Sequence, residues 1–484
     1  MALQKMEVPM PDTIMDGLAL AELVAIGQAT PTELLDAAIE RANRVNPAIN
    51  AITVPLFDAA RAQIGAGLPN GPYRGVPFLL KDIGATLAGV PTSAGSRLFA
   101  DQPAAHDSEV TRRLKHVGLV IFGKTNTPEF GSLPTTEPLL TGTTRNPWSL
   151  AHSAGGSSGG SAAAIAAGIV PAAHGTDGAG SIRIPASCCG LVGMKPTRAR
   201  ITGAPDVGES IGGISSQGVL SLTVRDSAAL LDALQGPAPG DPYYAEPPLT
   251  PYLASLETPL RRLKIAVTWH SMIGTILHQD CIDATDHAAK LCEAQGHTLI
   301  EDAPPLDGEV FYRLYRRFWP LSAARSIHRV DRQRGHPGAV DETEPFNQYL
   351  FEVSRGVSAL DYILDLQWFH AATRAFGNWF ATKGYDAWLT PTLGLPPPEL
   401  GFFDAAIHGG STVLDRFIAF LPFTPFANMT GQPAISLPLF WNAEGLPIGS
   451  QFFAPFGDET TLFQLAHELE MAQPWADRRP RVYA

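Results

Sequence analysis

The sequence predicts an α/β fold in which helices cover both faces of a large, mostly parallel or mixed β-sheet. Short apolar segments alternate with helical patterns: we expect a strand at 264–267, a helix at 280–295 and another strand at 297–300. Such alternation is typical of a sheet buried on both faces. The 484 residues, 45% hydrophobic and 17% charged, suffice for a large core.

Two helices are expected near the N-terminus. Residues 13–26 carry an apolar stripe of Ile14, Leu18, Leu23 and Val24. The second helix is expected to begin at Thr30, because Pro31 suits the first helical position and Glu33 completes a capping box. Its apolar residues recur at helical spacing, and Asn46-Pro47 is expected to end it.

Charge and composition exclude several classes of function. The formal net charge is −12 and no run of Lys or Arg exceeds two residues, so we expect no nucleic-acid or membrane partner. The first eleven residues lack the pattern of a secretory signal, and no window reaches about 18 uninterrupted apolar residues. Reduced thiols are expected at all four cysteines, two of which are adjacent. These features favour a cytoplasmic protein.

One stretch organises the chain. Residues 155–161 contain only Gly and Ser, and an Ala-rich segment follows at 162–167. A flexible linker would not continue into a strong helix former, so we expect a tight loop that feeds a packed helix. A second Gly-rich turn follows at 175–185, and a third segment, 189–197, reads CGLVGMKPT.

Together these segments resemble the amidase signature family of serine hydrolases, whose pattern is GGSSGGSxAAxAxG, GTDxGGSIRxPA and CGxxGxKPT. The match covers about forty residues. The resemblance implies the amidase signature fold, as a single amidase domain over 1–484. Its signature core would span about 70–235, and the C-terminal half, about 260–484, would complete the sheet and the substrate pocket.

The resemblance also implies three catalytic residues: Ser181 as nucleophile, Ser157 as bridging serine on a cis peptide, and Lys81 as base. From the residues alone, the apolar segment 75–82 that ends in Lys-Asp is more often a strand that steps into solvent with its charges paired, and only the resemblance favours a catalytic lysine there. An exposed lysine is neutral in only about one molecule in 2,500 at pH 7, so a basic Lys81 must be buried.

The turn around the nucleophile is expected to supply the oxyanion hole. The candidate backbone N–H groups are those of Gly178, Ala179, Gly180 and Ser181. The family usually has glycine where this chain has Ala179, so we expect a negative φ there.

Three further residues are expected to support the site. Asp177 and Arg183 are expected to brace the turn as an ion pair, and Ser158 is a supporting residue beside Ser157. The adjacent thiols of Cys188 and Cys189 are expected to be inert and buried, since no cationic group is placed beside them.

Two motif matches are interpreted as accidental. Residues 118–125 satisfy the phosphate-binding pattern GxxxxGK[ST], but the strand lies between the two glycines and Pro128 stands where a helix should run. Residues 155–159 satisfy GxSxG, but no buried apolar strand precedes them. A hydrolase with a histidine-based triad, using His297 or His408, stays open as a third interpretation.

A cluster of six phenylalanines between residues 402 and 426 has two interpretations. Its members are Phe402, Phe403, Phe417, Phe420, Phe423 and Phe426. Such residues are most often ordinary core, but they could also form an apolar wall for a hydrophobic acyl or aryl substrate.

The preferred function is an amidase that hydrolyses hydrophobic linear or cyclic amides, anilides or carbamates through an acyl-enzyme, with no metal or organic cofactor. Within the family, the chain resembles 6-aminohexanoate-cyclic-dimer hydrolases and urethanases. The alternative within the family is the glutaminase subunit of a tRNA-dependent amidotransferase. The partner is therefore a small-molecule amide or carbamate, and the oligomeric state is open, with a homodimer among the options.

Overall fold

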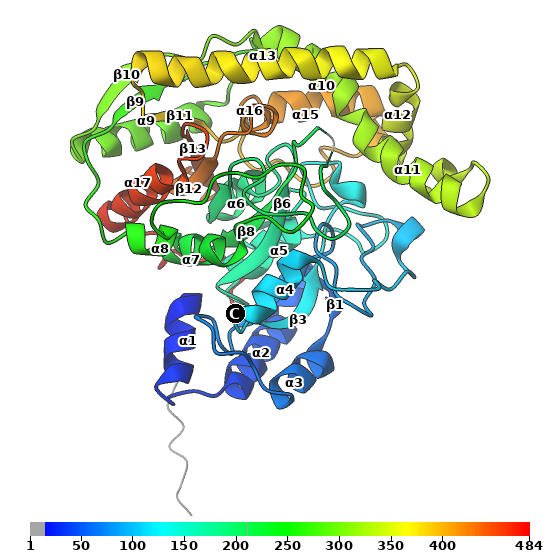
Figure 1. Cartoon of the computed structure of the whole chain (residues 1–484), viewed down its shortest axis with the longest axis vertical. Helices are drawn as coiled ribbons and strands as arrows, with labels where there is room; N and C mark the ends of the chain where they lie inside the picture. The colour runs from blue at the N-terminus through cyan, green and yellow to red at the C-terminus, as the bar shows by residue number, and fades with distance from the viewer. Residues whose placement is uncertain (1–14, 211) are drawn as a thin grey trace, which may run out of the picture.

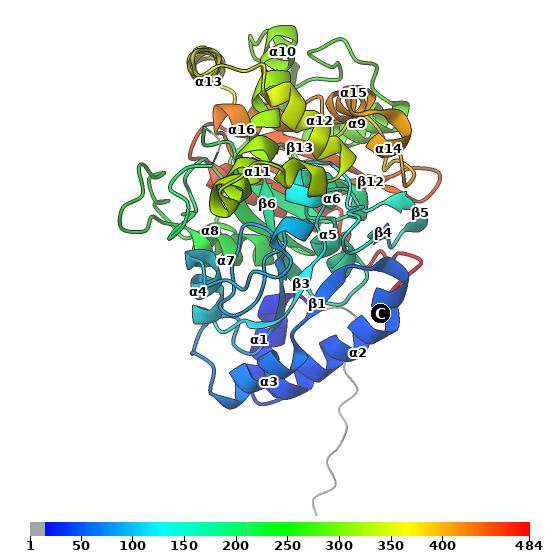
Figure 2. The same cartoon turned by 90° about the vertical axis from the view of Figure 1, so that its right-hand side faces the viewer.

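One mixed sheet runs through the molecule (Figures 1 and 2). The structure is a computed structural model that describes residues 15–210 and 212–484. In spatial order, the eleven strands found within these residues are β1 (Ile52–Pro55), β3 (Val120–Thr125), β2 (Pro77–Lys81), β6 (Ala172–Asp177), β8 (Ser216–Ser221), β7 (Val192–Lys195), β12 (Ala434–Trp441), β13 (Pro447–Phe453), β11 (Ala387–Pro391), β9 (Lys264–Val267) and β10 (Thr298–Glu301).

Strand directions confirm the predicted mixed sheet. β2 runs parallel to β3 and β6, and β9 runs parallel to β10 and β11, while the central pairs are antiparallel. The two halves of the chain meet at the antiparallel pair β7 and β12, where Lys195 lies opposite Ala434.

Helices cover both faces of this sheet, as predicted. Their bounds are α1 (Gly17–Ala25), α2 (Pro31–Ile49), α3 (Phe57–Gly65), α4 (Glu109–His116), α5 (Gly159–Ala166), α6 (Arg183–Cys189), α7 (Val224–Leu234), α8 (Tyr252–Ser255), α9 (Gln279–Ala294), α10 (Gly308–Phe318), α11 (Pro320–Arg334), α12 (Pro345–Ser354), α13 (Ala359–Lys383), α14 (Ala405–His408), α15 (Gly410–Phe420), α16 (Thr424–Thr430) and α17 (Glu459–Ala472). Helices α5, α6, α13, α15 and α16 pack in one core, and α1, α4, α7 and α17 in the other.

Strand β2 shows how the sheet separates the two cores. Its five residues are all buried. Leu79 packs in one core, whereas Phe78 and Leu80 pack in the other, because successive strand residues face opposite ways. Lys81 therefore projects to the same face as Leu79, which is the face covered by α5.

The N-terminal helices confirm the predictions only in part. In α2, Thr30 and Glu33 form the capping box and Pro31 takes the first turn, as predicted. The predicted end at Asn46-Pro47 is wrong, because the helix continues to Ile49 and Asn50 ends it at φ 49°. Pro47 lacks one backbone donor, but Ile49 beyond it is buried in the core and the last turn remains helical. Helix α1 buries Gly17, Leu20 and Ala21. Leu18, Leu23 and Val24 of the predicted stripe are half-buried against the same core, and Ile14 lies outside the described residues.

Further along the chain, the motif interpretations are confirmed. β3 contains Gly123 and Lys124, and a 3₁₀ turn, Glu129–Gly131, follows it, so residues 118–125 are not a phosphate loop. The segment before the GxSxG match forms β5 (Ser149–Ser153), which pairs with β4 (Arg145–Asn146) in a separate two-stranded sheet and is largely exposed at its centre. No helix of the described part of the chain is long and apolar enough to cross a membrane.

Candidate active site

Strand β2 carries Lys81 into a dry position beside Ser157. The side chain is fully buried, and its Nζ lies 2.7 Å from Ser157 Oγ and 2.9 Å from Thr176 Oγ1. Burial lowers the pKa of Lys81 well below its ordinary value, and the negative charge of Asp177 opposes this only partly. A lysine in this setting can accept a proton at neutral pH.

The Gly/Ser stretch is a packed loop, as predicted. The peptide bond between Gly156 and Ser157 is cis. A Cβ on Gly156 would lie 2.5 Å from the carbonyl oxygen of Thr135, and a Cβ on Gly160 would lie 2.4 Å from the backbone nitrogen of Asn126. The absence of side chains therefore lets neighbouring segments approach the loop closely. Helix α5 begins at Gly159, and all eight of its residues are buried.

Ser181 lies in the turn between β6 and α6 and is 6% exposed. The Ser158 N–H donates to the Ser181 carbonyl at 3.3 Å, and Ser158 Oγ donates to the Thr176 carbonyl at 3.3 Å. Ser158 thus joins the two turns that carry the candidate serines. Within the described residues, no hydrogen bond directly connects the hydroxyls of Ser157 and Ser181.

Asp177 and Arg183 form the predicted ion pair beneath this turn, with Arg183 Nη2 2.9 Å from Asp177 Oδ1 and both side chains fully buried. Asn428 Nδ2 also donates to Asp177 Oδ1, at 2.9 Å, and Arg183 donates to Gln451 Oε1 at 2.6 Å. Burial alone would raise the pKa of Asp177, but the charge and hydrogen bonds of Arg183 outweigh it and lower that pKa to about 2.

The oxyanion prediction needs one correction. The Gly180 N–H donates to Asp177 Oδ1 at 2.7 Å, so this amide is already occupied. Across residues 15–210 and 212–484, the N–H groups of Gly178, Ala179 and Ser181 have no hydrogen-bond acceptor. Gly180 instead supplies backbone freedom, with φ +126°. Ala179 is not among the residues with positive φ, which confirms the predicted backbone, and Thr424 Oγ1 donates to its carbonyl at 2.7 Å.

Comparison with known proteins shows the family to which this chain belongs. A family model for amidases matches residues 33–463. The chain is 38% identical to the 6-aminohexanoate-cyclic-dimer hydrolase of Paenarthrobacter ureafaciens, over 97% of each chain. This chain belongs to the amidase signature family. It is a hydrolase of amide bonds.

Solved structures agree with this assignment of the amidase. The structure of 6-aminohexanoate cyclic dimer hydrolase complexed with substrate aligns with a TM-score of 0.90 and 36% identity, covering 98% of this chain and 100% of that one. A bacterial aryl acylamidase of the amidase signature family aligns with a TM-score of 0.87 and 26% identity, covering 96% and 98%.

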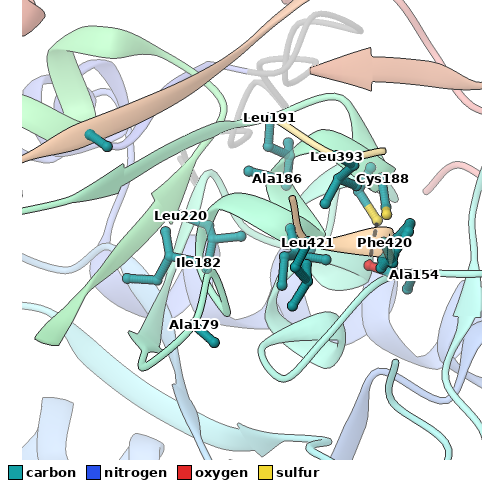
Figure 3. Close-up of a cluster of buried hydrophobic side chains, with 14 of the residues drawn as sticks. Ala154, Ala179, Ile182, Ala186, Cys188, Leu191, Leu220, Leu393, Phe420 and Leu421 are labelled. Carbon is teal, nitrogen blue, oxygen red and sulfur yellow. Dashed lines mark hydrogen bonds between the residues drawn. The ribbon is translucent and has the colours of Figure 1, made fainter. Parts of the chain in front are cut away.

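Apolar residues of the C-terminal half lie beside the turn that carries Ser181 in this amidase. Figure 3 shows Ala179 and Ile182 on the turn, with Phe420 and Leu421 on the neighbouring segment. A Cβ placed on Gly178 would lie 3.6 Å from the Trp319 ring, and Trp319 Nε1 donates to the Ser132 carbonyl at 3.2 Å. The Trp319 ring therefore lies against the turn at Gly178.

The phenylalanine cluster of the amidase is core. Five of its six members, Phe403, Phe417, Phe420, Phe423 and Phe426, are at most 2% exposed. The ring of Phe426 packs 4.5 Å from that of Phe311, and Phe417 packs 5.7 Å from Trp319. The core interpretation of these five rings is therefore confirmed, because they are buried and pack on other aromatic rings.

The remaining nucleophile and metal candidates are placed elsewhere. Cys188 and Cys189 are buried free thiols, and burial raises the pKa of both, so they are inert as predicted. His297 Nε2 lies 2.7 Å from Glu468 Oε2, and His408 ends α14. The described residues contain no group of three or more His, Cys, Asp or Glu side chains that could hold a metal ion.

Sequence reasoning missed two residues that complete the site of the amidase. The Lys81 amino group donates to Thr176 as well as to Ser157. Thr176 directly precedes Asp177 in the Gly-Thr-Asp motif, so the motif could have indicated that Thr176 belongs to the site. Asn428 contacts Asp177 and Arg183 from α16, more than 240 residues away in the chain, and no local pattern indicates that contact.

Proposed function

We propose that this amidase cleaves hydrophobic linear or cyclic amides, anilides or carbamates with Lys81, Ser157 and Ser181, by way of an acyl-enzyme. The observation that carries the proposal is the 2.7 Å contact between the fully buried Lys81 Nζ and Ser157 Oγ. A buried amine next to a hydroxyl is the arrangement that a serine relay needs.

The proposed reaction begins with neutral Lys81, which accepts the Ser157 proton while Ser157 accepts the proton of Ser181. Ser181 Oγ then attacks the substrate carbonyl carbon, and the C=O π pair moves onto oxygen. The N–H groups of Gly178, Ala179 and Ser181 donate to this oxyanion, each contributing on the order of 3 kcal/mol.

Collapse of the tetrahedral intermediate releases the amine, which takes its proton from Ser157, and leaves an ester on Ser181. Water then attacks this ester, with the same relay acting as base, and releases the carboxylic acid. The relay returns to its starting state.

The substrate class follows from the relatives and from the surroundings of the turn. The relative that is 38% identical is named a 6-aminohexanoate-cyclic-dimer hydrolase. A relative of known structure that is 26% identical is an aryl acylamidase. Trp319 and the apolar segment around Ala179 favour substrates with extended apolar or aryl groups. A carbamate presents the same planar carbonyl to Ser181.

The glutaminase interpretation has one supporting observation. The solved structure of a glutamyl-tRNA(Gln) amidotransferase component from Thermotoga maritima aligns with a TM-score of 0.74 at 26% identity. Its similarity to this chain is lower than that of the cyclic-dimer hydrolase, so a stand-alone amidase is favoured. Glutamine hydrolysis that requires added partner proteins would favour the glutaminase instead.

The test combines a substrate panel with trapping of the intermediate. The purified protein is assayed on anilides, cyclic amides, primary amides and carbamates, then quenched in acid and analysed by mass spectrometry. We expect the peptide that contains Ser181 to gain the mass of the acyl group, and Ser181→Ala to abolish both this adduct and turnover. Ser326→Ala, at a partly exposed position of α11, is the matched control. An adduct on another residue would refute the nucleophile assignment.

A further inference from the structure

Thr424 reaches the turn that carries Ser181 from the C-terminal half of the chain. It is the first residue of α16 and is fully buried. Its Oγ1 donates to the Ala179 carbonyl at 2.7 Å, although the two residues are 245 positions apart in the sequence. A Cβ built on Gly180 would lie 2.6 Å from the same oxygen, so the hydroxyl and the turn are in close contact. Thr424 therefore touches the turn at the peptide that joins Ala179 to Gly180.

This peptide is held at both of its polar groups. Thr424 donates to its carbonyl, and the Asp177 carboxylate accepts from its N–H at 2.7 Å. Asp177 is itself fixed by its buried ion pair with Arg183. Because the carbonyl and the N–H of a trans peptide point in opposite directions within one plane, these two hydrogen bonds set the orientation of the peptide.

The turn needs such contacts because glycines flank Ala179 on both sides. Gly180 has φ +126°, a backbone conformation that residues with a Cβ rarely adopt. A segment with glycine at 178 and at 180 has many accessible conformations when it is released, so its N–H groups would seldom keep one arrangement. Among the described residues, Thr424 is the donor that the Ala179 carbonyl has.

The other carbonyls of the turn are held in a similar way. Asn428 lies four residues after Thr424, on the same face of α16, and its Nδ2 donates to the Asp177 carbonyl at 2.9 Å. Four carbonyls of the turn accept hydrogen bonds, those of Asp177, Ala179, Gly180 and Ser181. A turn whose carbonyls are bonded and whose N–H groups stay free is suited to receive a negatively charged oxygen.

We propose that Thr424 is a positioning residue for the oxyanion hole. This role rests on the proposed function, in which the N–H groups of Gly178, Ala179 and Ser181 receive the oxyanion. By holding the Ala179 carbonyl, the Thr424 hydroxyl keeps these N–H groups in one arrangement before the substrate binds. Donors that are fixed in advance stabilise the transition state without a cost of reorganisation. Thr424 acts through the backbone of the turn and not by contact with the substrate.

The test compares Thr424→Val with Thr424→Ser. Valine has nearly the shape of threonine but cannot donate, whereas serine keeps the hydroxyl. With butyranilide as substrate, we expect Thr424→Val to lower kcat about 10–100-fold, somewhat less than the loss of a whole oxyanion donor, because the N–H groups remain but are no longer fixed. KM should change less than about threefold, since the lost interaction acts on the transition state. Thr424→Ser should restore kcat to within about threefold of the wild type.

Two further variants separate this role from a loss of packing. Thr424→Ala also lacks the hydroxyl and should lower kcat in the same way, so the result does not depend on the folding of one variant. Thr430→Val is the matched control, because Thr430 is also buried in α16 and its Oγ1 donates to the Phe426 carbonyl at 2.6 Å, within the helix. Its kcat should stay within about threefold of the wild type, whatever the change in thermal midpoint. An equal loss of kcat in Thr430→Val and Thr424→Val would overturn the proposal.

Inhibition by butyraldehyde gives a measurement that a purely structural role would not change. Ser181 Oγ adds to the aldehyde carbon, the C=O π pair moves onto oxygen, and the serine proton passes to Ser157. The resulting oxygen lies where the oxyanion of the reaction would lie, so the inhibition constant reports on the N–H donors. In Thr424→Val we expect this constant to rise by about the factor by which kcat falls, while Thr424→Ser and Thr430→Val stay near the wild type.

The outcomes distinguish this role from the proposed function. An active wild type with an acyl adduct on Ser181, together with a normal kcat and a normal butyraldehyde constant in Thr424→Val, would refute the role of Thr424 alone. A wild type that turns over none of the amides, anilides or carbamates and gives no adduct on Ser181 would refute the proposed function, and the role of Thr424 with it.

Discussion

Replacement of Lys81 by methionine tests the central step of the proposed reaction. Methionine nearly fills the space of the lysine stem but has no basic nitrogen. A general base contributes about 10²–10⁴-fold, and the relay behind Ser181 loses its only proton acceptor. We expect kcat to fall at least about 10³-fold, which corresponds to roughly 4 kcal/mol of transition-state stabilisation.

The pH profile of the wild type provides the sharper measurement. Only neutral Lys81 can act, and an exposed lysine would make kcat/KM climb tenfold per pH unit to about pH 10. Because burial lowers the pKa of Lys81 well below its ordinary value, we expect the profile to reach its plateau well before that. Lys195→Met is the matched control, since Lys195 is also fully buried, with a pKa lowered to about 7. The rising limb should keep its position in this variant.

The stability of the folded state should also rise with pH, in the same direction as activity. The unfolded chain binds a proton at Lys81 up to about pH 10.4, whereas the folded chain releases it at lower pH, so Lys81 makes stability rise with pH across that interval. Urea unfolding of Lys81→Met should lose this dependence without a loss of folding. Activity of Lys81→Met within tenfold of wild type, or a wild-type profile that climbs to pH 10, would refute the assignment of the base.

Two further changes separate catalysis from folding. Asp177→Asn leaves the Arg183 guanidinium buried without its counter-ion, and we expect urea denaturation to show a loss of about 3–5 kcal/mol. The pKa of Asp177 is lowered to about 2 in the folded state, so its ionisation stabilises the fold fully above about pH 4. This stabilisation declines by about 2 kcal/mol as the pH falls to 2. Measurements of the unfolding free energy against pH should show the decline in the wild type and not in Asp177→Asn. Gly131→Ala places a Cβ 3.1 Å from Ser157 Oγ at φ +67°, so we expect kcat to fall at least tenfold. Gly401→Ala is the control, because its φ is +84° and its Cβ would meet no described atom within 4 Å. It should cost a similar backbone strain of about 1 kcal/mol in stability without lowering kcat. Equal kcat values in these two glycine variants would mean that residue 131 does not control the position of the relay serine.

Local chemistry explains why much of the fold was predictable. The capping box of Thr30 and Glu33 is written in four consecutive residues, and the structure contains it. The Ala-rich segment that begins after Ser161 is helical, as the high helix propensity of alanine predicts. Pro47 was misjudged because the burial of Ile49 in the core keeps the last turn helical, and that packing is not visible in the local sequence.

The candidate site was predictable where a motif carried it and not where distant segments meet. The resemblance supplied Lys81, Ser157 and Ser181, and the structure brings the first two into contact. It also suggested the Gly180 N–H as an oxyanion-hole donor, but this N–H donates to the Asp177 carboxylate. The sequence motif does not indicate that hydrogen bond. The contribution of Asn428 depends on how α16 packs on the turn, which follows from the whole tertiary structure rather than from the neighbours of Asn428 in the chain.

The pairing of β7 with β12 has a consequence for how the enzyme is made. β7 ends at Lys195, but its partner strand begins at Ala434, so a ribosome must add more than two hundred residues before this seam can close. Until then, the catalytic motifs are synthesised beside an open sheet edge that invites aggregation. A truncated product of about 235 residues would carry every residue of the proposed relay, yet it should be insoluble and inactive. Contacts so distant in sequence also favour slow folding, so expression at low temperature with chaperones should raise the yield of active enzyme.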